Sequence, residues 1–151
     1  MKEIEPATVL LVEDDPGDQK LIRVSLNEQR VANELHIVSS GEEALDFLYE
    51  RGKYCNGTRR PDLILLDLNM PGMGGKEFLT RIKKDEDFKK IPVIVLTTSD
   101  SEQDIIDSYN LYASGYVKKP GGLVQFKKVA KEIGEYWFVT CKLPPRLEWS
   151  A

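Results

Sequence analysis

The sequence predicts an α/β fold in which a doubly wound, five-stranded parallel sheet carries helices on both faces. Five short apolar runs are each followed by a polar segment and then by apolar residues at helical spacing. The runs are apolar throughout instead of alternating with polar residues, which is typical of strands buried on both faces. This repeated strand–helix order indicates right-handed crossovers between parallel strands.

The first strand and helix are expected near the N-terminus. Residues 8–12 form an apolar run, TVLLV, that ends in a polar cluster containing Pro16 and Gly17. Pro16 suits the first turn of a helix, because the amide hydrogen that proline lacks has no intrahelical partner in that turn. Asp15 and Asp18 are both candidates for the N-cap, whose side chain accepts a backbone hydrogen bond.

The second strand is expected at residues 35–38. Ser40 and Glu43 then have the spacing of a capping box, in which each side chain bonds a backbone amide near the other residue. A polar loop at residues 51–61 leads to the third strand. His36, the single histidine, falls within the second strand and is expected to be an ordinary strand residue.

The other three strand–helix units follow the same plan. Their strands are expected at residues 63–66, 91–96 and 115–118. The first of these is the most apolar run in the chain and ends in a glycine-rich loop at residues 67–75. Pro92 stands at the start of the next strand, where a missing amide hydrogen is tolerated. Phe126 and Trp137 share one face of the last helix and are expected to pack it instead of binding a cofactor.

Length and composition describe one soluble domain. We expect a single domain over residues 1–151, with a core at about 7–138 and a C-terminal extension, 139–151, too short for an output domain. No apolar stretch is long enough to span a membrane, and the acidic N-terminus is unlike a signal peptide. Cys55 and Cys141 lie far apart without metal-ligand spacing and are expected to be reduced thiols. These features predict a cytoplasmic protein with no membrane partner.

The charge balance excludes one class of partner. The formal net charge is −4, and the lysine pairs after residue 82 are interrupted by acidic residues. Sequence-independent binding to nucleic acid needs a basic face, because phosphate contacts dominate that affinity. We therefore expect no nucleic-acid partner.

Chemically active side chains follow four of the predicted strands. Glu13 and Asp14 come after the first strand, Asp67 after the third, Thr97 after the fourth and Lys119 after the fifth. Ligand sites of open parallel sheets lie at these carboxyl ends. Crowded carboxylates repel unless a cation such as Mg²⁺, which prefers oxygen ligands, lies between them. A carboxylate nucleophile, a hydroxyl and an ammonium beside such a cation favour phosphoryl transfer.

Four segments of the sequence resemble the motifs of the response-regulator receiver family. They are Val12-Glu13-Asp14-Asp15, Leu66-Asp67-Leu68-Asn69-Met70-Pro71, Leu96-Thr97 and Tyr116-Val117-Lys118-Lys119-Pro120. Thr97 lies 30 residues after Asp67, and Lys119 lies 22 after Thr97, which are spacings of the family. The resemblance covers about residues 7–138. It implies a flavodoxin-like, CheY-like sheet with strand order 2-1-3-4-5.

The resemblance implies a role for each matching acid. Asp67 is expected to be the phosphoacceptor and a Mg²⁺ ligand. Asp14 would bind Mg²⁺ directly, Glu13 mostly through water, and Asn69 through its backbone carbonyl. Asp15 is expected to be a cap or a solvated acid, and not a further metal ligand.

The resemblance also implies how the phosphorylated state is sensed. Thr97 would be the switch hydroxyl, and Lys119 the ammonium that pairs with the phosphoryl group. Tyr116 would be the aromatic residue that moves inward when Thr97 is drawn toward phosphate. Ser99 would tune the access of water to the phosphoryl group. The family further implies a cis peptide bond between Lys119 and Pro120.

Three features are similar to the single-domain regulators that work with bacterial and cyanobacterial phytochrome kinases. They are the loop at 51–61, the run Leu96-Thr97-Thr98-Ser99, and the aromatic tail Tyr136-Trp137-Phe138 followed by Leu143-Pro144. The expected partner is therefore a sensor histidine kinase, within this subgroup a phytochrome. The resemblance also admits a homodimer.

Two other functions fit part of the pattern. An aspartate-nucleophile phosphohydrolase on a similar fold would need an acid two residues after Asp67, where this chain has Asn69. A scaffold derived from a receiver would typically lose an acid, the threonine or the lysine, and none is lost here. The favoured interpretation is a phosphoacceptor switch, not an enzyme with a small-molecule substrate, that supports its own phosphotransfer and autodephosphorylation.

Overall fold

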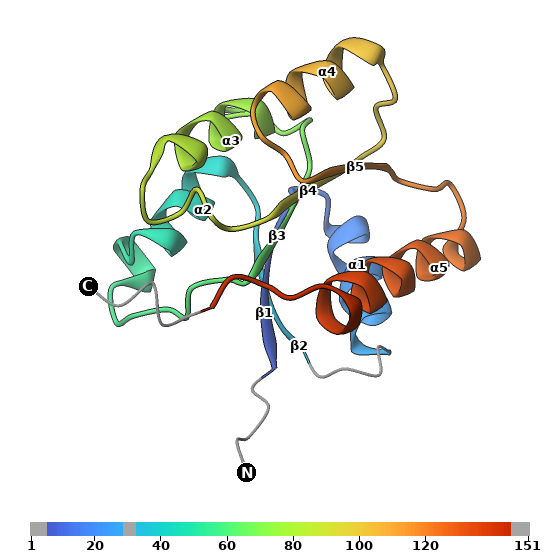
Figure 1. The fold of residues 1–151 in the computed structure, drawn as a ribbon, viewed down its shortest axis with the longest axis horizontal. Helices are drawn as coiled ribbons and strands as arrows, with labels where there is room; N and C mark the ends of the chain where they lie inside the picture. The colour runs from blue at the N-terminus through green and yellow to red at the C-terminus, as the bar shows by residue number, and fades with distance from the viewer. Residues whose placement is uncertain (1–5, 29–32, 146–151) are drawn as a thin grey trace.

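Five parallel strands form the centre of the computed structural model, which describes residues 6–28 and 33–145. They are β1 (Ala7–Val12), β2 (Asn33–Val38), β3 (Leu63–Leu66), β4 (Val93–Thr97) and β5 (Gly115–Lys118). Their order in the sheet is β2-β1-β3-β4-β5, with every neighbouring pair parallel (Figure 1). The predicted fold class is confirmed.

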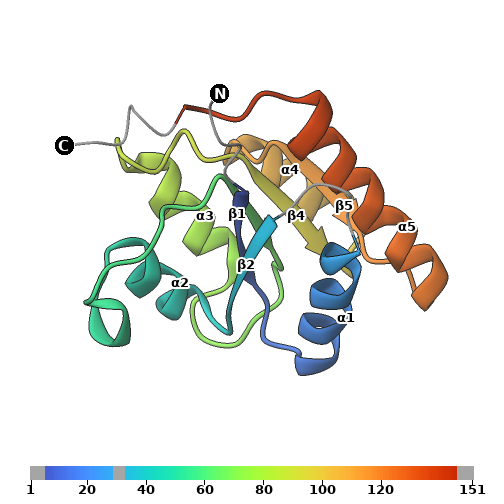
Figure 2. The same cartoon turned by 90° about the horizontal axis from the view of Figure 1, so that it is seen from below.

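Helices cover both faces of the sheet. They are α1 (Pro16–Asn27), α2 (Gly41–Leu48), α3 (Gly75–Lys84), α4 (Glu102–Asn110) and α5 (Leu123–Gly134), with a short 3₁₀ turn η1 at Gly52–Tyr54. Helices α1 and α5 pack together on one face, and α2, α3 and α4 lie on the other (Figures 1 and 2). Each face has its own apolar core. None of the described helices is both long and apolar enough to cross a membrane.

The strand sequences explain this double-sided burial. Every residue of β3 and β4 is buried. Successive side chains of a strand point to opposite faces of the sheet, so these two strands need buried side chains on both faces. Ile64 and Leu66 join the core beneath α2 and α3, whereas Leu63 and Leu65 join the core beneath α1 and α5. The continuous apolar pattern is thus a direct result of the two helical layers.

Local caps differ in detail from the sequence expectation. Asp15, not Asp18, is the N-cap of α1, and its Oδ1 accepts a hydrogen bond from Gly17 N at 3.3 Å. Ser40 caps α2 as expected, with 3.0 Å between its Oγ and the amide nitrogen of Glu43. The Glu43 carboxylate returns to the amide of Ser39, one residue earlier than a capping box predicts. Asp18 is thereby left for another role.

The last helix continues further than α5 itself. Residues Glu135–Thr140 form a π-helical segment, η2, that carries the aromatic tail. Phe126 is buried in the core beneath α1 and α5, and Trp137 packs against its edge, which confirms their packing role. His36 lies in β2 with its ring 5.2 Å from that of Phe47, as expected for an ordinary strand residue.

Candidate functional site

The carboxyl ends of four adjacent strands bring the predicted side chains together. Glu13 and Asp14 follow β1, Asp67 follows β3, Thr97 ends β4 and Lys119 follows β5. Because β1, β3, β4 and β5 are consecutive in the sheet, these residues share one edge. One oxygen from each of the three acids lies within 4.8 Å of the others. Lys119 Nζ lies 3.4 Å from Asp67 Oδ2.

Asp67 is placed by the backbone on both sides of it. Its amide donates to the carbonyl of Val12 at 3.0 Å, which extends the β1–β3 pairing one residue past β3. The amide of Asn69 donates to Asp67 Oδ1 at 3.3 Å, so the chain turns around the carboxylate. The side chain stays 9% exposed, which leaves a narrow approach for a reacting group.

The glycine-rich loop passes close behind Asp67. A Cβ atom added to Gly75 would lie 2.7 Å from Leu68 Cα and closer still to the carbonyl oxygen of Asp67. Only glycine lets the start of α3 approach the loop backbone this closely. The close contact sets where the loop that carries Asp67 lies relative to α3.

Glu13 is the most deeply buried acid of the site, with 1% of its surface exposed. Burial raises the pKa of its carboxyl from 4.5 to about 7, and the nearby Asp67 charge acts in the same direction. Hydrogen bonds from Lys119 and from the amide of Asp15 oppose this shift in pKa. A bound cation would also lower the pKa of Glu13, because it favours the ionised carboxylate as these hydrogen bonds do.

Lys119 is the cation that holds the acids together. Its ammonium contacts Glu13 Oε1, lies 2.8 Å from Asp18 Oδ2 and reaches Asp67. Burial by itself would lower the pKa of Lys119, but the bonds to Asp18 and Glu13 and the charge of Asp67 raise it instead. The ammonium therefore stays charged at neutral pH.

Asp18 is the functional residue that sequence reasoning missed. It was considered only as a helix cap, yet its carboxylate binds Lys119 across 101 residues of sequence. One available signal was its spacing: Asp18 comes three residues after Asp15, so it lies one helical turn beyond the cap and near the same edge.

Three acids of the site are suited to a divalent cation. Glu13, Asp14 and Asp67 supply hard carboxylate oxygens in one cluster, and their mutual repulsion favours a cation between them. Asp14 is half-buried, so its oxygens can reach both solvent and the cluster. The involvement of the Asn69 carbonyl stays a prediction.

Thr97 is connected to helix α4 through Ser99. The hydroxyl of Thr97 is buried and accepts long hydrogen bonds of 3.5 Å from Asn69 Nδ2 and from Ser99 N. Ser99 Oγ donates to Asp104 in α4 at 2.6 Å, and Tyr116 OH donates to the carbonyl of Ser99 at 2.8 Å. A shift of Thr97 would therefore reach both α4 and β5.

The peptide bond before Pro120 corrects the family-based expectation. The described residues contain no cis peptide bond, so Lys119–Pro120 is trans. A bond before proline favours trans by about 0.5–1 kcal/mol unless its surroundings impose the other isomer. Here Lys119 reaches the site with the trans bond, while its amide donates to Thr97 O at 2.7 Å.

The remaining assignments of the loop residues agree with the structure. Lys118 is exposed and pairs with Asp100 at 2.9 Å, away from the buried ammonium of Lys119. Asp15 is exposed and serves as a cap. The sequence predicted this role for Asp15, which is confirmed as a cap.

Comparisons of this chain with family models, with known sequences and with solved structures agree with one another. Residues 9–131 match the model of the response regulator receiver domain family. Response regulator Rcp1 of Synechocystis sp. is 42% identical over 92% of this chain and 94% of its own length. Among solved structures, the phosphorylated cyanobacterial phytochrome response regulator RcpA has a TM-score of 0.88, 42% identity and coverage of 93% of this chain and 100% of that chain. The Mn²⁺-bound form of Rcp1 has a TM-score of 0.87 at the same identity and coverage.

Proposed function

This chain belongs to the response regulator receiver family, and from that premise we propose that Asp67 accepts a phosphoryl group from a sensor histidine kinase. One observation carries the proposal: Asp67 lies in one cluster with two further acids, and the ammonium of Lys119 lies beside it. A carboxylate oxygen of Asp67 attacks phosphorus, an O–P bond forms, and the P–N bond to the kinase histidine breaks with its electron pair going to the imidazole.

We assign the divalent cation to Mg²⁺, held by Glu13, Asp14 and Asp67 with the Asn69 carbonyl. The oxygen-only ligands of this cluster fit the ion. When bound there, the cation would neutralise charge on the transferring oxygens. Titration of the protein with Mg²⁺ should raise its melting temperature, since an ion that binds only the folded state stabilises it.

Lys119 then exchanges partners during the reaction. In the unmodified protein its ammonium is shared by Asp18, Glu13 and Asp67. A phosphoryl group on Asp67 brings oxygens with greater negative charge to the same place. Lys119 can bind one of these oxygens while its ammonium stays paired with Asp18.

Thr97 connects phosphorylation at the site to a change at the protein surface. The hydroxyl of Thr97 holds its present partners only at 3.5 Å, so a phosphoryl oxygen can attract it. Ser99 would follow, because its amide is bonded to that hydroxyl. Tyr116 in β5 and Asp104 in α4 are bonded to Ser99, so the surface of α4 and β5 would change.

We place the protein in phytochrome signalling in the cytoplasm, with a phytochrome-type histidine kinase as its partner. Support comes from two proteins that this chain resembles, the cyanobacterial phytochrome response regulator RcpA and the bacteriophytochrome response regulator AtBRR. The readout is a partner protein, onward phosphotransfer or a homodimer. Autodephosphorylation through the same site is part of this proposal. The phosphohydrolase alternative gains no support, since Asn69 occupies the position of its second acid.

The test is labelling by a small phosphodonor. Acetyl phosphate with Mg²⁺ should give one acid-labile, hydroxylamine-sensitive phosphate per chain, and Asp67→Asn should abolish it. Asp100→Asn, which removes an exposed acid outside the pocket, is the matched control and should be labelled normally. Persistent labelling of the Asp67→Asn variant would refute the assignment.

A further inference from the structure

Helix α4 is held to the rest of the protein by very little apolar burial. Ser108 is its only buried residue, whereas α3 buries Phe78, Leu79 and Ile82 in the core. Ile106, an apolar residue of α4, is 52% exposed. Since apolar burial is the main force that fixes a helix on a sheet, polar contacts have a large share in deciding where α4 lies.

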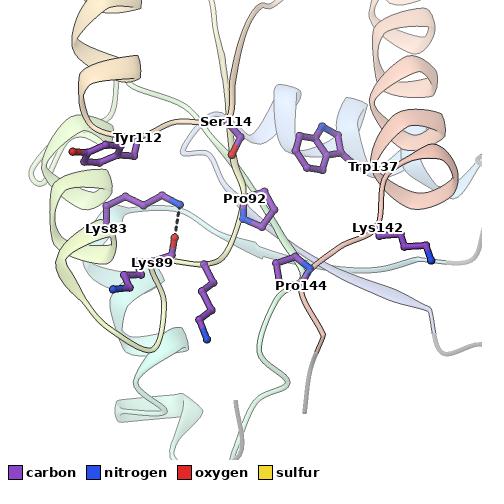
Figure 3. Close-up of a pocket in the computed structure, with 9 residues that line it drawn as sticks. Lys83, Lys89, Pro92, Tyr112, Ser114, Trp137, Lys142 and Pro144 are labelled. Carbon is purple, nitrogen blue, oxygen red and sulfur yellow. Dashed lines mark hydrogen bonds between the residues drawn. The ribbon is translucent and has the colours of Figure 1, made fainter. Parts of the chain in front are cut away.

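The C-terminal end of α4 is the better anchored of its two ends. Ala113 is buried in the core beneath α2 and α3, and Leu111 packs against that core. Between them, the exposed Tyr112 lines a lysine-lined cavity of about 550 Å³ together with Lys83 and Trp137 (Figure 3). The end of α4 that is free of such anchors is therefore the one beside Ser99.

Ion pairs with α3 hold the N-terminal part of α4. Lys76 Nζ lies 2.6 Å from Asp104 Oδ1 and 2.9 Å from Asp107 Oδ2, and these two contacts are the α3–α4 ion pairs. Hydrogen bonds to Asp104 and Asp107 raise the pKa of Lys76, and the bond from Lys76 lowers the pKa of Asp104, so both partners are charged at neutral pH. Lys76 directly follows Gly75, whose close contact with the backbone of Asp67 fixes the start of α3.

The carboxylate that Lys76 binds also holds Ser99. Asp104 Oδ2 accepts a hydrogen bond from Ser99 Oγ at 2.6 Å, while Oδ1 is the oxygen bound by Lys76. The amide of Ser99 donates to the hydroxyl of Thr97. When Thr97 moves and Ser99 follows, either the bond between Ser99 and Asp104 breaks or Asp104 follows as well. The α3–α4 ion pairs oppose the second course, because they would be stretched.

We propose, on the basis of the proposed phosphorylation of Asp67, that Lys76 is a positioning residue that keeps Thr97 in its unphosphorylated arrangement by holding Asp104. The α3–α4 ion pairs stabilise the present arrangement more than one in which Thr97 has moved toward Asp67. A ligand that needs the rarer arrangement binds with an affinity reduced by the fraction of molecules that adopt it. Lys76 thereby keeps that fraction low until a phosphoryl group is present.

The experiment measures the affinity of the full chain for beryllofluoride, an anionic analogue of the phosphoryl group, by calorimetry at saturating Mg²⁺. Lys76→Met should raise this affinity about two- to fivefold, the range expected from a partly exposed ion pair. Loss of a positive charge alone would weaken the binding of an anion, so a gain in affinity cannot come from charge. Lys76→Arg should keep the affinity of the parent, because it retains the cation. Arg81→Met, which removes an exposed ion pair with Glu77 from the same helix, is the matched control and should not gain affinity.

A second measurement tests whether Lys76 acts through Ser99. In amide NMR spectra recorded without the analogue, the Ser99 signal of Lys76→Met should lie part of the way toward its position in the analogue-bound parent. The gain in affinity should disappear when Lys76→Met is combined with Ser99→Ala, which removes the bond to Asp104.

The outcomes separate this role from the phosphorylation of Asp67. Unchanged or weaker binding by Lys76→Met, a Ser99 signal that stays at the parent position, or an equal gain in the Ser99→Ala background would each overturn the role of Lys76. A parent chain that does not bind the analogue would count against Asp67 as the phosphoacceptor, on which the role of Lys76 rests. The two proposals therefore fail in distinguishable ways.

Discussion

Of two glycine-to-alanine substitutions, Gly75→Ala should destabilise the protein and Gly17→Ala should not. Both residues lie in the first turn of a helix, Gly75 in α3 and Gly17 in α1. A Cβ on Gly75 would meet the backbone of Asp67 and Leu68, with the Leu68 Cα at 2.7 Å, whereas real Cβ atoms essentially never approach below 3.0 Å. A Cβ on Gly17 would lie an ordinary 3.7 Å from the Asp15 carboxylate.

The expected magnitudes follow from what must move. Relieving the clash at Gly75 shifts backbone against backbone, and overpacking of this kind costs roughly 1–3 kcal/mol. For a chain of this length, that loss in the free energy of unfolding lowers the melting temperature by about 2–4 °C per kcal/mol. Gly17→Ala should leave stability unchanged or raise it by up to about 1 kcal/mol, since alanine restricts the unfolded chain.

Urea unfolding monitored by circular dichroism measures both variants, and Mg²⁺ titration tests the site. Gly75→Ala should also weaken Mg²⁺ binding and slow phosphorylation, because the clash falls on the carbonyl of Asp67 itself. Equal stability of the two variants would contradict the inference that the close approach of α3 sets the position of the loop that carries Asp67.

Three further substitutions test single interactions. Asp18→Asn should lower Mg²⁺ affinity several-fold, because Lys119 is then left to neutralise Glu13 and Asp67; calorimetry showing unchanged affinity would remove Asp18 from the site. Thr8→Val should raise the free energy of unfolding by about 1 kcal/mol, since the Thr8 hydroxyl is buried without a hydrogen-bond partner among the described residues; a loss of stability in urea would show an unseen partner. The stability of Lys83→Met relative to the parent should be greatest well below pH 8, where the half-buried ammonium of the parent is fully charged. Because the folded pKa, about 8, lies below the ordinary 10.5, the unfolded chain binds more protons between these values. The parent should therefore gain stability relative to the variant, on the order of 1 kcal/mol after allowing for exposure, as the pH rises from 8 to 10.5, and a flat difference would contradict the shift in pKa.

Much of the fold was predictable because it rests on local patterns. Continuous apolar runs predict strands buried on both faces, and the alternation with helical segments predicts the parallel order. Boundaries were less certain: β4 spans Val93–Thr97 instead of residues 91–96, because pairing with β3 and β5 decides where a strand ends. Asp15 and Asp18 were indistinguishable as caps, since both are acids near Pro16.

The sequence by itself determined that Glu13, Asp14, Asp67, Thr97 and Lys119 lie at one edge, because carboxyl ends of parallel strands share that edge whatever the packing around them. Only the tertiary structure decided which acids Lys119 binds and where the lysine-lined cavity forms. Those contacts join segments far apart in the chain: Asp18 meets Lys119 across 101 residues, and Lys83 and Trp137 line one cavity from opposite sides of the sheet's edge. No local pattern encodes such distances, because they depend on how α1, α3 and the C-terminal segment are packed against the finished sheet.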